Sequence, residues 1–285
     1  MKNLIFIALS LSIGISTAFA QITTPKAEMT KLADDVYTFS YAGTRTIVIT
    51  TKDGVIIGDP ISPKAAPLLQ AEIKKLTDKP VKYMVYSHSH WDHVLGGKIF
   101  KDAGAKVISQ RNCLDSFYRY PNPDLAMPDT SYDQHMEITL GGRTVRLIYL
   151  GLNHSDCMTF MLIPHAHILH IVDVVTPGSV PVGTGKMEDT YLLDTIRTLK
   201  DIEALDFTTM VGGHGIPSAP KKAVTERREY MEALMIAVKT EIEAGTPFGE
   251  ISGKISLPQF KHLTGYDRFL RNNAERVLIY NSIGW

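Results

Sequence analysis

The spacing of apolar and polar residues predicts a group of β-strands in the first part of the chain. Residues 36–40, 45–51 and 55–58 are rich in Val, Ile, Thr and aromatic residues, as is typical of strands. A Lys-Asp-Gly sequence at 52–54 predicts a hairpin turn between the last two strands. Residues 64–76 have apolar side chains at helical spacing and predict a helix.

Strands and helices continue to alternate along the rest of the chain. Strands are expected at 81–86, 105–109 and 208–211, as a hairpin over 138–150 and as a pair within 158–175; helices are expected at 93–100, 191–205, 221–244 and 267–281. Strand-rich stretches with interposed helices thus occur twice. This order favours an α+β protein with two sheets packed face to face and helices outside. No stretch has the composition of a linker, so residues 21–285 are predicted to form a single domain.

The N-terminus has the pattern of an export signal. Lys2 precedes an apolar stretch at 4–15, and Ala18 and Ala20 are small residues at the positions that signal peptidase recognises. The stretch is shorter than the roughly 20 residues of a membrane span. We therefore expect residues 1–20 to be a signal peptide cleaved after Ala20, rather than an anchor. The protein would then be periplasmic or secreted, without stable membrane insertion.

Composition excludes some classes of function. The chain has 285 residues, of which 44% are hydrophobic, with 30 Lys and Arg against 30 Asp and Glu. These values are typical of a globular protein. The balanced charge argues against a nucleic-acid partner, since such binding relies on an excess of cations. The sequence leaves the oligomeric state open.

The two cysteines have two interpretations. Cys113 and Cys157 would both enter an oxidising compartment after export, where they could form one disulfide. Equally, they could be two small buried apolar residues, because the sequence does not show whether their side chains meet.

The most informative motif is Ser-His-Ser-His-Trp-Asp-His at 87–93, directly after a predicted strand. In an extended segment His88 and His90 point to the same side, which suits two ligands of one metal ion. Asp92 and His93 follow after the chain turns and can face a second ion. Imidazole and carboxylate ligands suit zinc and also tolerate iron or manganese. A polar loop with histidines by chance is a much weaker interpretation.

Three residues further along the chain could complete such a site. His154 follows the end of one predicted strand, Asp173 ends an apolar strand, and His214 lies between glycines after another strand. An unpaired buried carboxylate at position 173 would be costly. Each residue alone is a weak indication, but all three lie at strand ends.

With these residues the chain resembles the metallo-β-lactamase-fold hydrolases, whose motif is His-x-His-x-Asp-His followed by a His, a bridging Asp and a His in Gly-His-Gly. The resemblance covers about residues 33–217 and implies a four-layer αβ/βα sandwich with two zinc ions per chain. By this resemblance one ion takes His88, His90 and His154, and the other takes Asp92, His93 and His214, with Asp173 bridging them.

The resemblance also implies how such a centre would act. Water between the two ions would lose a proton near neutral pH and serve as the nucleophile, and Asp92 is the candidate catalytic residue that orients it. Asp59, in Ile-Gly-Asp-Pro at 57–60, is the candidate for holding the free N–H of a ligand histidine. A turn-capping role for Asp59 is equally consistent with the sequence.

Several other residues have competing interpretations. His165 and His167 follow a proline at a predicted hairpin turn and are expected to be exposed, whereas His170 is expected in the core. Trp91, Tyr118, Tyr120 and the loop at 176–186 could line a substrate pocket, although aromatic residues more often pack in a core.

Residues that differ from the patterns of individual subfamilies narrow the range of activities expected for this chain. Asp173 weakens assignment as a dedicated β-lactamase, Thr176 stands where lactonases often have Tyr, and no basic cluster for glutathione follows near the C-terminus. The prediction is an exported dinuclear zinc hydrolase acting on a small ester, lactone or lactam. Alternatives are β-lactamase-like activity, a catalytically silent accessory protein of a periplasmic system, and hydrolysis of phosphodiesters or sulfate esters.

Overall fold

A computed structural model of the chain describes residues 25–182 and 186–284. The predicted signal peptide lies outside these residues. Among the helices within the described ranges, none combines the length and the apolar character needed to cross a membrane.

The first sheet has seven strands in sequence order: β1 (Glu28–Lys31), β2 (Val36–Tyr41), β3 (Thr44–Thr51), β4 (Gly54–Ile57), β5 (Val81–Val85), β6 (Lys106–Gln110) and β7 (Thr130–Tyr132). The strands β1 to β4 form antiparallel pairs, and β4 to β7 form parallel pairs. Parallel neighbours need crossover connections, and α1 (Ala65–Leu76) is the crossover from β4 to β5.

The second sheet has six strands: β8 (His135–Leu140), β9 (Arg143–Ile148), β10 (Phe160–Ile163), β11 (Ile168–Ile171), β12 (Thr209–Gly212) and β13 (Ala219–Pro220). Antiparallel pairing from β8 to β11 is again followed by a parallel pair, β11 with β12, connected through α5 (Leu192–Ala204). The second half of the chain thus repeats the plan of the first, as the order of predicted elements indicated.

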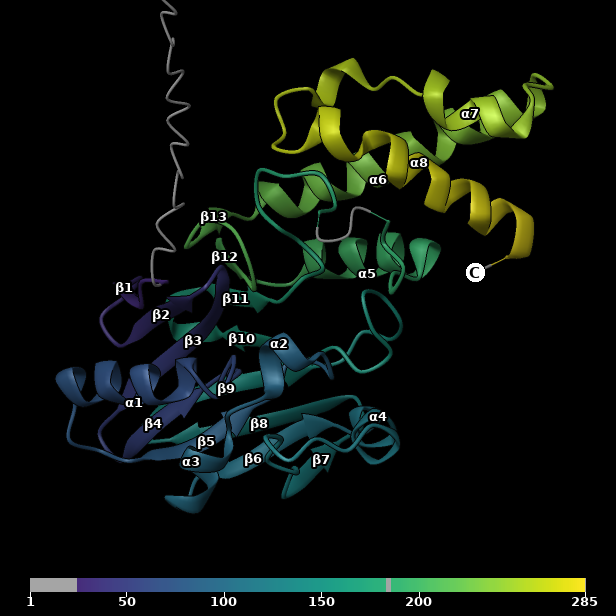
Figure 1. Cartoon of the computed structure of the whole chain (residues 1–285). Helices are drawn as coiled ribbons and strands as arrows, with labels where there is room; N and C mark the ends of the chain where they lie inside the picture. The colour runs from purple at the N-terminus through teal and green to yellow at the C-terminus, as the bar shows by residue number, and fades with distance from the viewer. Residues whose placement is uncertain (1–24, 183–185, 285) are drawn as a thin grey trace, which may run out of the picture.

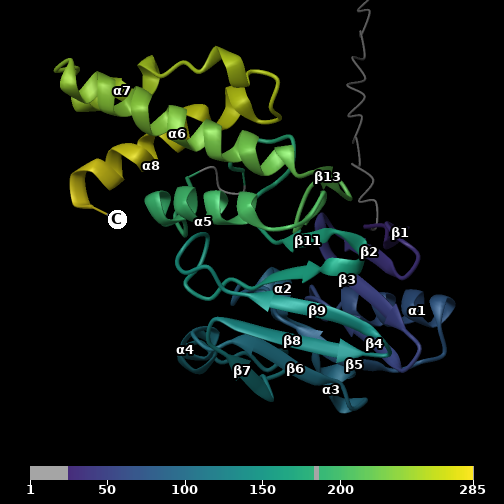
Figure 2. The same cartoon turned by 180° about the vertical axis from the view of Figure 1, so that it is seen from behind.

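Three apolar layers hold four layers of secondary structure together. Ile47 and Ile56 of the first sheet share one layer with Leu147 and Val211 of the second. A second layer lies between the first sheet and its helices, and the third lies between the second sheet and α5 to α8. In both views α6 to α8 lie at one end of the molecule and α1 and α3 at the other (Figures 1 and 2). The predicted αβ/βα sandwich is confirmed.

The remaining helices are α2 (Trp91–Val94), α3 (Lys98–Asp102), α4 (Cys113–Arg119), α6 (Lys222–Glu243), α7 (Phe248–Lys254) and α8 (Tyr266–Ile283), with 3₁₀ turns at Pro164–Ala166 and Pro258–Phe260. The expected helix at 93–100 is wrong, because the chain forms two short helices, α2 and α3, with a break between them. At the break Gly96 has a φ of +91°, and a Cβ there would lie 2.4 Å from the backbone of Ser62. The sequence analysis also missed β1, β7, β13, α4 and α7.

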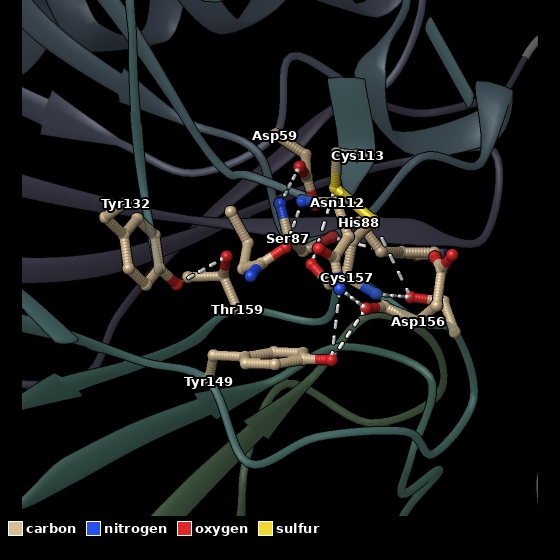
Figure 3. Close-up of a disulfide and its surroundings, with 12 residues drawn as sticks. Asp59, Ser87, His88, Asn112, Cys113, Tyr132, Tyr149, Asp156, Cys157 and Thr159 are labelled. Carbon is tan, nitrogen blue, oxygen red and sulfur yellow. Dashed lines mark hydrogen bonds between the residues drawn. A yellow bond between two sulfur atoms is a disulfide. The ribbon is translucent and has the colours of Figure 1, made fainter. Parts of the chain in front are cut away.

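A disulfide joins Cys113, the first residue of α4, to Cys157 in the segment that precedes β10 (Figure 3). Both side chains are buried. Of the two interpretations of the cysteines, the structure therefore agrees with the disulfide. It fixes the chain three residues after His154, a candidate ligand.

Candidate metal centre

The candidate ligands converge because they follow strands whose carboxyl ends meet at one edge of each sheet. Asp59 and His88 follow the parallel strands β4 and β5, while Asp173 and His214 follow the parallel strands β11 and β12. His154 lies in the loop between β9 and β10. In sheets of this kind, sites form outside the carboxyl ends of parallel strands.

The seven residues form two groups, in each of which the possible ligand atoms lie within 4.8 Å of one another. The first contains His88, His90, His154 and Asp173, and the second contains Asp92, His93 and His214. The rings of His88 and His90 lie 4.3 Å apart between centroids.

Asp173 lies between the two groups. Its Oδ2 is 3.1 Å from His93 Nε2, 3.5 Å from His154 Nε2 and 3.7 Å from His88 Nε2, and its Oδ1 is 3.2 Å from His214 Nε2. One carboxylate thus faces histidines of both groups, which is the position that a bridging ligand needs.

Local backbone geometry allows this close approach. Asp173 has a φ of +57°, in the left-handed region, which Asp tolerates better than most residues. A Cβ on Gly213 would lie 2.6 Å from Asp173 Oδ1 and 3.1 Å from a ring carbon of His93. The glycine before His214 is therefore required by the packing of the site.

The donor atoms fit a cation. Within the described residues, His88 Nε2, His93 Nε2 and Asp173 Oδ1 are buried and have no hydrogen-bond partner. Leaving such atoms unsatisfied is costly, whereas imidazole nitrogens and carboxylate oxygens at these separations are suitable ligands for zinc. A divalent metal ion in each group would satisfy them.

The surroundings of the site shift the pKa values of its histidines in opposite directions. Burial, together with the neighbouring histidines His93 and His90, lowers the pKa of His88 well below its ordinary value, and burial and His154 lower the pKa of His90. Burial alone would also lower the pKa of His93 and His214, but the Asp173 carboxylate outweighs it and raises both pKa values. Burial would raise the pKa of Asp173, but His93 and His214 hold it well below its ordinary range.

Hydrogen bonds at Nδ1 orient two of these histidines, His88 and His214. Ser87 Oγ lies 2.8 Å from His88 Nδ1 (Figure 3), and His214 Nδ1 lies 2.9 Å from the carbonyl oxygen of Gly43. These partners leave Nε2 of each ring to face the centre. Such partners fix the ring orientation of metal-binding histidines.

Asp59 lies between His93 and the turn after β5. Its Oδ1 accepts a hydrogen bond of 2.8 Å from the Ser87 backbone N–H, and its Oδ2 lies 3.3 Å from His93 Nδ1. The side chain is fully buried. The position of Asp59 is therefore compatible with both interpretations, contact with a ligand histidine and capping of a turn.

We expect Asp59→Asn to lower metal affinity by about 10- to 100-fold. An amide has only one acceptor oxygen, so the side chain could accept from the Ser87 N–H or face His93 Nδ1 with its oxygen, but not both. The measurement is zinc competition with a chelating dye, with Asp78→Asn, at an exposed position, as the matched control. Equal affinity in both variants would contradict the role of Asp59.

Two cavities open beside the candidate ligands. One, of about 300 Å³, is lined by His90, Asp92, His154, Asp173, His214, Val174, Thr176, Pro181, Val182, Met187, Glu188, Asp189, Thr190, Thr195, Arg227 and Met231. The other, of about 470 Å³, is lined by Ser89, His90, Trp91, Asp92, Ser116, Phe117 and Tyr120. His90 and Asp92 line both cavities, so the centre lies where a substrate could reach it.

Only some of the residues suggested as lining a substrate pocket line a cavity in the structure. Trp91 and Tyr120 line the second cavity, whereas Tyr118 is exposed and lines neither. From the loop at 176–186, Thr176, Pro181 and Val182 line the first cavity, and residues 183–185 lie outside the described residues.

The three other histidines with a predicted degree of burial lie where expected. His165 and His167 are exposed, and His165 pairs with Asp35. His170 is buried and lies against the Val211 carbonyl oxygen, and burial lowers its pKa to about 4.

Sequence reasoning missed Asp189, Thr195 and Arg227. Asp189 Oδ1 lies 3.6 Å from His154 Nδ1, and its Oδ2 lies 3.9 Å from His90 Nε2. Asp189 belongs to no motif, so no signal could have found it. Arg227 had a signal, because it stands at an inward position of the apolar pattern of α6.

Two packed mixed sheets with a His/Asp cluster at their common edge define a class of metal-binding α+β proteins. The family model of the metallo-beta-lactamase superfamily matches residues 43–214, and the chain belongs to this superfamily. At the family level it is a hydrolase with a candidate metal-binding site.

Relatives of known name have different activities. The chain is 25% identical over 207 residues to the "Metallo-beta-lactamase type 2" of Elizabethkingia meningoseptica, covering 69% of this chain and 81% of that protein. It is 23% identical over 296 residues to the "Linear primary-alkylsulfatase" of a Pseudomonas species, covering 84% of this chain. The chain spans only 55% of that sulfatase.

Solved structures support the fold. A metallo-beta-lactamase from Pontibacter korlensis matches with a TM-score of 0.64 at 18% identity, over 73% of this chain and 99% of that one. A double mutant of a sec-alkyl sulfatase matches with a TM-score of 0.72 at 14% identity, over 91% of this chain and 50% of that one.

Proposed function

We propose that this chain is an exported dinuclear zinc hydrolase that cleaves a small ester, lactone or lactam. One observation carries the proposal: seven ligand-type side chains, including the Asp173 carboxylate between both groups, converge beside two open cavities. Zinc ions in these groups would supply Lewis-acid chemistry, polarising the oxygen of the scissile group and making water a stronger nucleophile.

The chain's own residues would orient the reactants. The Asp92 carboxylate lies 3.5 Å from His93 Nε2 and 3.6 Å from His214 Nε2, yet its side chain is 57% exposed. It therefore reaches the second group from the solvent side, where it can accept a hydrogen bond from an attacking water. Asp173 would hold the two groups together, and Asp59 would keep His93 in place.

Export is part of this proposal. The basic and apolar N-terminus with Ala18 and Ala20 supports it. The Cys113–Cys157 disulfide supports it independently, because disulfides persist mainly in oxidising compartments.

A second candidate activity is sulfate-ester hydrolysis. The alkylsulfatase relative and the sec-alkyl sulfatase structure cover 84% and 91% of this chain, a larger share than the two lactamases cover. A metal centre that polarises an oxygen of the scissile group could act on a sulfate ester as well as on a carboxylic ester.

The test is metal analysis of the mature protein, followed by turnover of a panel of esters, lactones, lactams and sulfate esters. We expect about two zinc ions per chain, turnover of at least one class, and loss of turnover in EDTA with recovery on adding zinc. A well-folded protein that binds no metal would refute the proposal. Two bound ions without turnover of any class would instead favour the accessory-protein alternative.

A further inference from the structure

The most unusual charge outside the candidate ligands is the guanidinium of Arg227 on α6. Its side chain is buried, at 6% relative exposure, on the same face of the helix as Val224, Tyr230 and Met231. Among the described residues, the side chain of Arg227 has no hydrogen bond and no carboxylate within 4.0 Å, and its Nε is buried without a partner. A buried cation without an acceptor is costly.

The other buried arginines each donate at least one side-chain hydrogen bond, although Arg45 Nε is also buried without a partner. Arg45 Nη2 donates to the Gly215 carbonyl oxygen at 2.9 Å, and Arg276 donates to the carbonyl oxygens of Met187 and Thr190. Glu226, beside Arg227 in the sequence, lies 2.8 Å from His262. Although burial lowers the pKa of Arg227 to about 10, the side chain still carries its charge at neutral pH.

A second unpartnered polar group faces the same space. Thr195 Oγ1, on α5, is buried and has no hydrogen-bond partner among the described residues. A helical threonine often donates to the carbonyl oxygen four residues earlier, as Thr240 does to Ile236. Thr195 and Arg227 both line the 300 Å³ cavity onto which His90, Asp92 and Asp173 open.

We propose that Arg227 and Thr195 form an anion-binding subsite, and that the substrate of this chain carries an oxyanion group, a carboxylate or a sulfate. Val174, Val182 and Met231 supply apolar contacts for the body of the substrate. Two carboxylates of the lining, Glu188 and Asp189, interact electrostatically with Arg276. The substrate is therefore an anionic ester, lactone, lactam or sulfate ester. The inference rests on the proposed hydrolytic function.

Arg227 is not part of the shared family motif. The family match ends at His214, before α6 begins. This subsite would therefore distinguish the substrate of this chain from those of other superfamily members.

The test compares three esters with the zinc-loaded protein: p-nitrophenyl succinate, which carries a free carboxylate, p-nitrophenyl pentanoate, which is neutral, and p-nitrophenyl sulfate. We expect an anionic ester to be preferred. The preference is the ratio of kcat/KM for the anionic ester to kcat/KM for the neutral ester. In Arg227→Met this ratio falls by about 10- to 100-fold, mainly because KM for the anionic ester rises when a hydrogen bond to a charged group is lost. Thr195→Val, which keeps the shape, lowers it by about 2- to 10-fold. The anionic ester that shows this dependence identifies the group bound.

Arg228→Met is the matched control. Arg228 is the next residue of α6 but pairs with Glu203 and Glu232, so its replacement should leave the preference as in wild type. An Arg227→Met variant that keeps the wild-type preference, or a wild type that prefers the neutral ester, would overturn the proposal while hydrolysis itself stands.

A second measurement does not depend on turnover. In metal-free protein, p-nitrobenzoate should raise the Tm of wild type more than p-nitrobenzyl alcohol does, and this difference should vanish in Arg227→Met. Without ligand, Arg227→Met itself should raise Tm by about 2–8 °C, because it removes an unpaired buried charge. A structural arginine would give a lower Tm and no ligand effect. If no ester is cleaved, the hydrolase proposal fails and this measurement alone decides on the subsite.

Discussion

Replacing Asp92 with Ala is expected to lower kcat of the zinc-loaded protein by about 10²- to 10⁴-fold, the range typical of a positioned acid or base. The carboxylate is more than half exposed and makes no hydrogen bond with the residues that the structure describes, although it lies within 3.6 Å of two candidate ligands. The variant should therefore fold normally. Stopped-flow or steady-state turnover on the best ester of the panel measures the effect.

A control variant and a measurement of zinc content identify the cause of the fall in kcat. Asp206→Ala, at a side chain that is 90% exposed near His167, is the control and should retain full turnover. Zinc content measured in the same Asp92→Ala samples separates a lost ligand from a lost proton acceptor. Turnover within threefold of wild type would remove Asp92 from the mechanism.

Replacing both Cys113 and Cys157 with Ala is expected to lower the free energy of unfolding by about 2–5 kcal/mol. The cross-link closes a loop with a sequence separation of 44 residues, which restricts the unfolded chain. For a protein of this size the loss corresponds to a fall in Tm of about 5–15 °C. Thermal unfolding of the metal-free proteins is the measurement.

The same variant should also bind zinc more weakly, because the cross-link holds the segment after His154. Around it, Thr159 N donates to the Ser87 carbonyl oxygen at 2.6 Å, and Tyr149 OH donates to that of Asp156 at 2.9 Å (Figure 3). Reductant serves as the control: it should lower the Tm of wild type and leave the double variant unchanged. Identical Tm values for both proteins would show that the cross-link contributes nothing to stability.

The sequence predicted those parts of the molecule whose physical signal is local. Strand and helix periodicity located the long elements, since α6 at Lys222–Glu243 matches an expectation of 221–244. The compact motif at 87–93 identified most of the candidate centre, because one extended segment fixes the relative position of its side chains. The αβ/βα arrangement came both from the order of elements and from the family resemblance.

What the sequence did not predict depends on contacts between distant segments. The break at Gly96 reflects the close approach of the backbone at Ser62. The strand β7 has only three residues and pairs with β6 across a long connection. Asp189, in the turn before α5, and Thr195, on α5, reach the cavity only after α5 packs on the second sheet.

The candidate ligands come from both sheets: His88, His90, Asp92 and His93 follow β5 of the first, whereas His154, Asp173 and His214 lie in loops of the second. Ions held by this set would tie the two halves of the sandwich together, so occupancy and folding would be thermodynamically linked. Each tenfold excess of free ion over its dissociation constant would add about 1.4 kcal/mol to the unfolding free energy. Scarcity of zinc in the environment would therefore reduce the amount of folded protein as well as its turnover.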